Sequence, residues 1–189
     1  YEMQRSLVGS EMCIRDRTKR IDKVIVMSGR NAYKATGAWD YVEKALKDNG
    51  IGYINYDQVT PNPTTVHVND AAKMARDFGA KAVIAIGGGS PTDAGKSVAI
   101  LLEYPEKTAE NIYDFEFAPE KAAPIVSINL THGTGTETNR FAVVTNLEKN
   151  FKPAIAYDCI YPMFAIDDPQ LMTCLLYTSP SPRDYAASR

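Results

Sequence analysis

The chain has 189 residues, of which 44% are hydrophobic and 23% are charged. This composition is typical of a single globular domain and excludes a disordered chain, a collagen-like repeat and a disulfide-rich scaffold. The formal net charge is −2, so the chain lacks the basic field that would attract nucleic acid or an anionic membrane, and neither partner is expected. No apolar run approaches the roughly 20 residues of a membrane-spanning helix, and we expect a cytoplasmic protein.

The two ends of the chain do not read as parts of a fold. Residues 1–17 and 173–189 show no helical or strand periodicity, and the second segment carries a Ser-Pro-Ser-Pro turn cluster. Their strings SLVGSEMCIRDR and CLLYTSPSPRD resemble translated sequencing-adapter reads, although ordinary flexible termini are the alternative. We expect two non-native tails around one domain at residues 18–172, cut from a longer protein.

The first half of this domain alternates strand and helix patterns. Residues 24–27 form a short apolar run, which predicts a strand buried on both faces. Residues 38–49 carry apolar side chains at helical spacing, and Gly50 supplies a left-handed stop. Residues 53–56 predict a second strand. Asn62-Pro63 has the cap-then-proline order that opens a helix.

The second half continues the alternation. Residues 82–86 predict a third strand, after which Ser90 is expected to cap and Pro91 to start another helix. Residues 125–128 predict a fourth strand. This pattern is typical of a Rossmann-like, doubly wound α/β fold with a mostly parallel sheet.

A β-hairpin is predicted beyond the fourth strand. Residues 141–145 and 153–157 flank the polar segment 146–152 as two strands flank a turn. This would be an antiparallel addition to the parallel sheet.

Three glycines follow the third strand directly. Ligands of open α/β sheets bind outside the carboxyl ends of the strands. At Gly87, Gly88, Gly89 and Ser90 the missing side chains would let backbone N–H groups approach an anion, with the positive end of the next helix aimed at it. We interpret this segment as a phosphate cradle; a plain tight turn is the alternative.

Two further strand ends carry polar residues. Asp57 closes the second strand and could accept hydrogen bonds from a ribose, but it precedes Gly87 by 30 residues, so the GxGxxG fingerprint is not matched. A solvated turn aspartate is equally compatible with the spacing. Residues 131–137, THGTGTE, suit a loop around a cofactor or a mere polar turn.

Two other site classes are not supported. The segment at residues 90–97 ends like a Walker A loop, but Gly89 is one residue too far from Gly95. The two histidines, His67 on a predicted helix and His132 in a loop, lie 65 residues apart and form no metal-binding pair. We expect His67 to be an exposed helix residue.

The segment at residues 85–96, AIGGGSPTDAGK, resembles the GGGSxxDxxK signature of the iron-containing, group III alcohol dehydrogenase family. Other segments resemble that family's YDGVxPNPT, TAGTGSE, FAVIT and VDPEL motifs, and they lie at residues 56–64, 131–137, 141–145 and 165–171. The resemblance covers residues 18–172. It implies a dehydroquinate synthase-like dinucleotide-binding domain.

The resemblance also implies which residues would contact NAD. Asp57 would hold the adenosine ribose, and the glycine turn would surround the pyrophosphate. The full set of implied cofactor-binding residues is Asp57, Gly87, Gly88, Gly89, Ser90, Asp93, Thr131, Thr134, Asn139 and Lys152. His132 and Asn139 depart from the residues common in the family.

In the family, one Asp and three His bind divalent iron or zinc in a following helical domain, which this chain would lack. Neither Asp167 nor Asp168 matches that ligand. The resemblance therefore implies the cofactor part of a homo-oligomeric, NAD-dependent alcohol dehydrogenase acting on a small alcohol or aldehyde, inactive by itself, with no catalytic or metal residue here. The alternatives are a relative of glycerol dehydrogenase or dehydroquinate synthase, and a nucleotide-binding module without catalysis.

Overall fold

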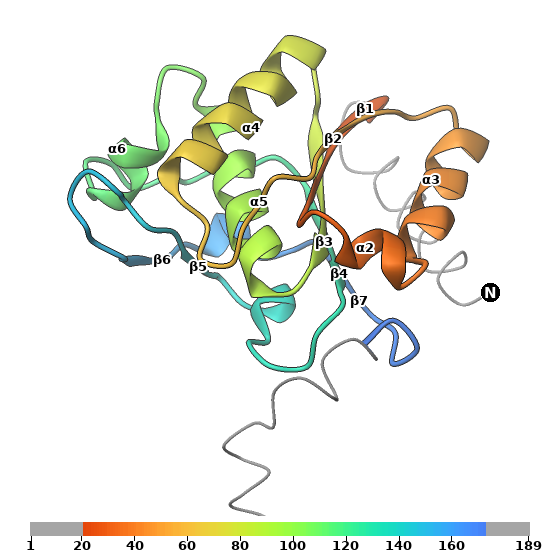
Figure 1. Cartoon of the computed structure of the whole chain (residues 1–189). Coiled ribbons are helices and arrows are strands. Elements are labelled where there is room, and N and C mark those ends of the chain that lie inside the picture. Colours follow the sequence, from red (N-terminus) through yellow and green to blue (C-terminus); the bar gives the residue numbers. More distant parts are fainter. Residues whose placement is uncertain (1–20, 173–189) are drawn as a thin grey trace, which may run out of the picture.

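A five-stranded parallel sheet lies between two layers of helices in the computed structural model, which describes residues 21–172 (Figure 1). The strands, in spatial order, are β2 (Gly52–Tyr56), β1 (Lys23–Ser28), β3 (Ala82–Gly87), β4 (Ile125–Asn129) and β7 (Phe164–Asp167). The helices are α2 (Ala32–Ala35), α3 (Ala38–Asp48), α4 (Thr65–Phe78), α5 (Gly89–Glu103) and α6 (Ala109–Tyr113), with 3-10 turns η1 (Thr136–Thr138) and η2 (Asp158–Ile160). The predicted doubly wound α/β fold is confirmed.

The two faces of the sheet bury separate apolar clusters because successive side chains of a strand point to opposite faces. Ile25 and Met27 of β1 pack on the face covered by α4 and α5, whereas Val24 and Val26 pack on the face covered by α2 and α3. Every strand residue from 24 to 28 is therefore buried. Because the strands are buried on both faces of the sheet, their sequences are continuous apolar runs rather than alternating patterns.

The predicted hairpin is also confirmed. Strands β5 (Phe141–Val143) and β6 (Ala154–Ala156) pair antiparallel, with an additional bridge between Asn146 and Phe151. The hairpin joins the segment before α4 through a bridge between Thr64 and Thr145. It therefore links the second and fourth crossover connections of the sheet.

Both helix starts that were predicted from proline are wrong by two residues. The cap of α4 is Thr64, not Asn62, which adopts a left-handed φ of 59°. The cap of α5 is Gly88, and Ser90 lies inside the first turn of the helix. Pro91 also lies in that turn, where its missing N–H would have no intrahelical acceptor.

Three elements have no counterpart in the predictions. The helices α2 and α6 have four and five residues, too few for a helical period to show. The strand β7 has only Ile166 buried among its four residues, since it lies at the edge of the sheet. Its existence depends on pairing with β4 rather than on a local apolar run.

His67 is half-buried and not the exposed helix residue that we expected. Its Nδ1 accepts a hydrogen bond from the Thr64 backbone N–H at 3.1 Å, and the backbone N–H of His67 donates to Thr64 Oγ1 at 3.4 Å. This reciprocal pair is a capping box at the start of α4. Burial lowers the pKa of His67, and the nearby Asp70 opposes that shift.

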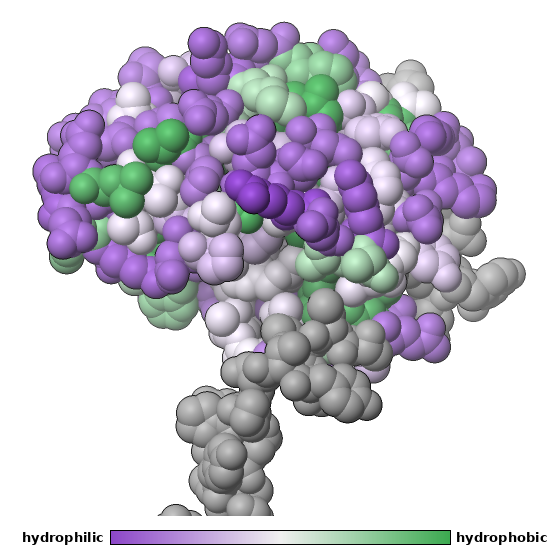
Figure 2. Space-filling view, in the orientation of Figure 1, coloured by the Kyte–Doolittle hydropathy of each residue, from purple (hydrophilic) through white to green (hydrophobic). Residues whose placement is uncertain are grey.

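The predicted tails, residues 1–17 and 173–189, lie outside the described residues. Figure 2 shows a face that is mostly hydrophilic with separate hydrophobic patches. Among the helices within residues 21–172, none combines the length and the apolar character needed to cross a membrane.

Replacing Thr64 by Ala should lower the free energy of unfolding by about 1 kcal/mol, because an N–H of the first turn of α4 loses its acceptor. Urea denaturation measures this change, and Thr64→Ser, which keeps the hydroxyl, is the matched control. Equal stability of Thr64→Ala and the parent chain would show that the capping box contributes nothing.

Candidate functional site

The order of the strands places a ligand site at the carboxyl ends of β1 and β3. The connection that follows β1 leads to β2 on one side, whereas the connection that follows β3 leads to β4 on the other side, so the chain leaves these two neighbouring strands in opposite directions. Such a switch point opens a crevice outside the carboxyl edge of the sheet. The glycine turn predicted as a phosphate cradle begins there, at Gly87.

At three glycines of this turn an added Cβ atom would lie unusually close to a neighbouring side chain. Gly87 has a φ of 151°, and a Cβ atom there would lie 2.7 Å from Pro91 Cγ. A Cβ atom on Gly88 would lie 2.6 Å from Thr131 Oγ1, and one on Gly89 would lie 3.1 Å from Thr134. The structure thus brings the glycine turn and the threonine-rich loop together, as the predicted site requires.

The turn remains open to a ligand. Gly88, Gly89 and Ser90 are half-exposed, and they stand at the first turn of α5. The N–H groups of a first helical turn have no intrahelical acceptor and point out along the helix axis. The arrangement fits a diphosphate, whose oxygens would accept from these groups at the positive end of the helix.

Asp93 lies one turn further along α5 and already uses both carboxylate oxygens. Oδ1 accepts from the hydroxyl of Thr136 at 2.6 Å, and Oδ2 accepts from the backbone N–H of Val143 at 3.0 Å. Burial raises the pKa of Asp93, while these hydrogen bonds and the charges of Lys96 and Lys152 oppose the shift. Asp93 therefore connects α5 to the threonine-rich loop and the hairpin.

Asn139 likewise has its amide engaged. Its Nδ2 donates to the Gly135 carbonyl at 2.9 Å, and its Oδ1 accepts from the Phe141 N–H at 2.8 Å. Asp93 and Asn139 were both predicted to contact the cofactor. In the structure they bond to the protein itself.

Lys96, which we did not name as a site residue, is fully buried behind the loop. Its ammonium donates to the backbone carbonyls of Thr136 at 2.7 Å, Asn139 at 2.8 Å and Phe141 at 2.7 Å. Burial lowers the pKa of Lys96 to about 8, and the charges of Asp93 and Glu137 oppose the shift. The sequence feature that could have pointed to Lys96 is its position three residues after Asp93, which places both side chains on one face of the helix.

Asn129 is a second residue that sequence reasoning missed. Its Nδ2 donates to Asp167 Oδ1 at 3.0 Å, and its Oδ1 accepts from the Thr131 N–H at 3.1 Å. It pairs with Gly87 in the sheet register, so it fixes the start of the threonine-rich loop beside the glycine turn. A hollow of about 340 Å³ adjoins it, lined by Asn129, His132, Gly133, Gly135, Glu137, Asp167, Pro169 and Met172.

Asp57 and Lys152 lie on the other side of the glycine turn. Asp57 follows β2 at the carboxyl edge and is half-buried. Two strand spacings separate β2 from β3, so Asp57 lies roughly 10 Å across the edge from Gly87. Lys152 donates to Asn62 Oδ1 at 2.5 Å, which places it beside the segment that joins β2 to α4.

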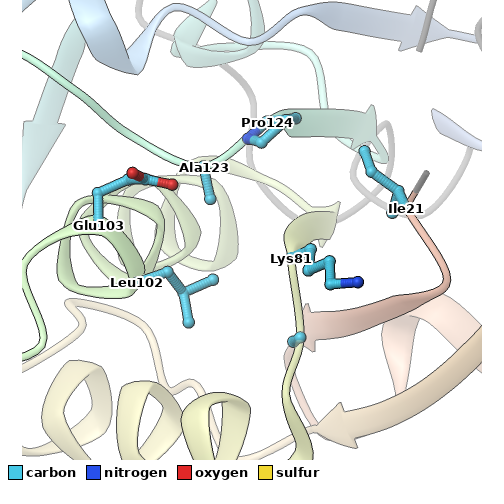
Figure 3. A pocket seen from close by; sticks show the side chains of 7 residues that line it. Ile21, Lys81, Leu102, Glu103, Ala123 and Pro124 are labelled. Atoms are coloured by element: carbon cyan, nitrogen blue, oxygen red, sulfur yellow. The ribbon is translucent and has the colours of Figure 1, made fainter. Parts of the chain in front are cut away.

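A larger hollow of about 450 Å³ lies at the amino ends of the strands, opposite the glycine turn (Figure 3). Glu103 from the end of α5 and Lys81 from the start of β3 lie on different walls, with apolar side chains such as Leu102 between them. Because this hollow adjoins the amino ends of β1, β3 and β4, it is remote from the glycine turn.

Within residues 21–172, no three His, Cys, Asp or Glu side chains are grouped so that they could hold a metal ion. The described residues therefore assign no metal ligand.

The fold and the glycine turn define a Rossmann-like α/β domain whose glycine turn lies at the switch point of the sheet. A family model described as iron-containing alcohol dehydrogenase matches residues 8–169. Since this is most of the chain, the chain belongs to the iron-containing alcohol dehydrogenase family.

Individual relatives agree with this family. The long-chain primary alcohol dehydrogenase AdhA of Thermoanaerobacter ethanolicus is 59% identical over 173 residues, which are 89% of this chain and 43% of that protein. The NADPH-dependent butanol dehydrogenase of Clostridium saccharobutylicum is 36% identical over 79% of this chain and 39% of its own length. The solved structure of NADH-dependent butanol dehydrogenase A from Thermotoga maritima gives a TM-score of 0.81 at 32% identity, over 89% of this chain and 41% of that one. The chain thus spans about two fifths of these relatives.

The buried ammonium of Lys96 should make the stability of the chain depend on pH. The pKa of Lys96 is about 8 in the folded chain and takes its ordinary value of 10.5 in the unfolded chain, so the unfolded chain binds more protons between these two values. The contribution of Lys96 to the free energy of unfolding should therefore rise with pH across that window.

Urea denaturation of the parent chain and of Lys96→Met, at about pH 7.5 and about pH 10, measures this dependence. The difference in free energy of unfolding should shift in favour of the parent at the higher pH. A difference that does not change with pH would contradict the lowered pKa.

Proposed function

We propose that this chain is the NAD-binding part of an alcohol dehydrogenase that, with a divalent metal, transfers hydride between a primary or small alcohol and NAD. The observation that carries the proposal is the turn at Gly87, Gly88 and Gly89, where an added Cβ atom would lie within 3.1 Å of a threonine side chain or of Pro91. The family and the names of the relatives support the reaction class.

The proposed contacts follow the shape of a dinucleotide. The pyrophosphate would accept from the N–H groups of the glycine turn, with the hydroxyls of Thr131 and Thr134 beside it. The adenosine ribose would reach Asp57, at a separation from the turn of roughly 10 Å. Lys152 would add a positive charge on the same side.

In this proposal Asp93 and Asn139 hold the loop and the hairpin in place around the cofactor site. Both oxygens of Asp93 accept hydrogen bonds from the loop and the hairpin, and a free carboxylate beside a diphosphate would repel it. The amide of Asn139 is likewise bonded to Gly135 and Phe141. Direct contacts from these two side chains stay a prediction from the sequence.

Bound NAD supplies the hydride acceptor, and the metal acts as a Lewis acid on the alcohol oxygen in this class of enzyme. We place the metal ligands and the substrate pocket outside residues 21–172. One relative is named for long-chain primary alcohols and another for butanol, so the proposal is limited to the class of primary or small alcohols and the corresponding aldehydes. A cytoplasmic location and a homo-oligomeric parent stay predictions from the sequence.

Two alternatives from the sequence are less well supported. The family match and the relatives named as alcohol dehydrogenases favour the main proposal over a relative of glycerol dehydrogenase or dehydroquinate synthase. They also favour a part of an enzyme over a nucleotide-binding module without catalysis.

Gly88→Ala should weaken NAD binding by at least about tenfold, because the new Cβ atom displaces Thr131 from the cradle. Isothermal titration of the 189-residue chain with NAD measures the dissociation constant. Gly52→Ala is the matched control, because it lies at the amino end of β2 and its Cβ atom would meet nothing closer than 3.4 Å. Unchanged affinity in Gly88→Ala would remove the glycine turn from the site.

Asp57 should decide the choice between NAD and NADP. Its carboxylate would accept from both ribose hydroxyls of NAD but repel the 2′-phosphate of NADP. The repulsion and the lost hydrogen bonds should together make the binding free energy of NADP less favourable than that of NAD by roughly 2 to 3 kcal/mol. This corresponds to about a 30- to 150-fold preference for NAD.

The ratio of the two dissociation constants measures this preference. Asp57→Gly should abolish most of it, whereas Asp57→Asn, which keeps an acceptor but no charge, should relieve NADP while largely preserving NAD binding. If the parent chain binds both cofactors equally, or if the ratio survives Asp57→Gly, then Asp57 is only a solvated turn residue.

A further inference from the structure

The ammonium of Lys96 is the point on which one end of the threonine-rich loop converges. The carbonyl oxygens of Thr136, Asn139 and Phe141 all lie within 2.8 Å of Nζ. The hydroxyl of Thr136 and the Oδ1 of Asn139 lie at 3.0 and 3.3 Å. Three carbonyl dipoles that point at one place repel each other, and the ammonium group at their centre offsets this repulsion.

The charge of Lys96 is compensated within the same cluster. Asp93, one turn earlier on α5, and Glu137, in η1, are the acidic side chains whose charges act on Lys96. The hydroxyl of Thr136 accepts from Lys96 and donates to Asp93, because an ammonium group can only donate. The cluster therefore joins two side chains of α5 to one residue of the loop.

A short chain of contacts connects this cluster with the glycine turn. The backbone N–H of Thr136 donates to Thr134 Oγ1 at 3.4 Å. The side chain of Thr134 in turn lies over Gly89, at the first turn of the helix that carries Lys96. One helix thus provides the cradle at its start and, two turns later, holds the loop that covers the cradle.

From these contacts we propose that Lys96 is a positioning residue for NAD. Its ammonium acts as a tethered cation that orders residues 134–141 and so keeps the side chain of Thr134 over the glycine turn before the cofactor binds. Without this ammonium, the loop would become ordered only when the cofactor binds. The cost of ordering the loop would then make the binding free energy of the diphosphate less favourable. This inference rests on the proposed function, since it concerns how the same site is prepared for NAD.

The test compares variants of the 189-residue chain by NAD titration and by amide hydrogen exchange. Lys96→Met should weaken NAD binding by roughly tenfold or more and speed exchange in residues 134–141, with little change in β3. Val98→Ala is the matched control: it removes buried volume from the same helix and lowers the melting temperature, but it should leave the dissociation constant unchanged below that temperature.

Chemical rescue separates a cation from mere packing. Lys96→Ala removes a fragment equivalent to n-propylamine, so adding n-propylammonium should restore NAD affinity in Lys96→Ala and have no effect on Val98→Ala. Thr136→Val, which removes the hydroxyl between Lys96 and Asp93, should weaken NAD binding in the same direction, and it serves if the Lys96 variants do not fold.

Normal NAD affinity in Lys96→Met, or in Thr136→Val where the Lys96 variants do not fold, would overturn the inference. So would an equal loss in Val98→Ala, or a failure of the added amine to restore binding. Failure of the parent chain to bind NAD would instead overturn the proposed function, and the two results are therefore distinguishable.

Discussion

A buried ion cluster between α5 and the loop at residues 134–141 is the interaction on which the site depends. A lysine that is fully removed from water is costly unless its charge is paired and its N–H groups are all bonded. Lys96 donates to three backbone carbonyls, and the charges of Asp93 and Glu137 offset part of the cost of burying its own charge. This cluster lets a polar loop with little regular structure hold one conformation beside a glycine turn.

The close packing of α5 on the sheet makes this arrangement possible. A Cβ atom on Gly95 would lie 3.2 Å from the Ala85 Cβ and 3.3 Å from the Val83 Cγ1, so the helix lies almost directly on β3. Its first turn then stands at the end of that strand, where the crevice opens. Lys96 follows Gly95, but it leaves the sheet toward the loop. Packing, anion cradle and loop attachment are thus consecutive features of one helix.

The hollows at the two ends of the strands show that the volume of a hollow by itself says little about function. The larger hollow lies at the amino ends of the strands, lined by Lys81, Glu103 and apolar side chains. The smaller one adjoins Asn129 and the threonine-rich loop at the carboxyl edge. Among the described residues, the first turn of α5 and the closely packed glycines meet at the carboxyl ends of the strands, and a diphosphate is recognised by features of this kind.

The sequence by itself determined the doubly wound fold, the hairpin and the place of the glycine turn, because apolar periodicity and glycine runs are local signals that each segment carries. The tertiary structure alone decided the rest. The edge strand β7 exists through its pairing with β4, Gly88 is required by a threonine 43 residues away in the chain, and Lys96 meets its carbonyl acceptors 40 to 45 residues further on. The contacts of Asp93 and Asn139 with the cofactor stay a prediction, and the bonds that both side chains make within the protein could be found only from the structure. Hydrogen-bond partners of this kind are set by which segments the sheet brings together, and no local pattern records them.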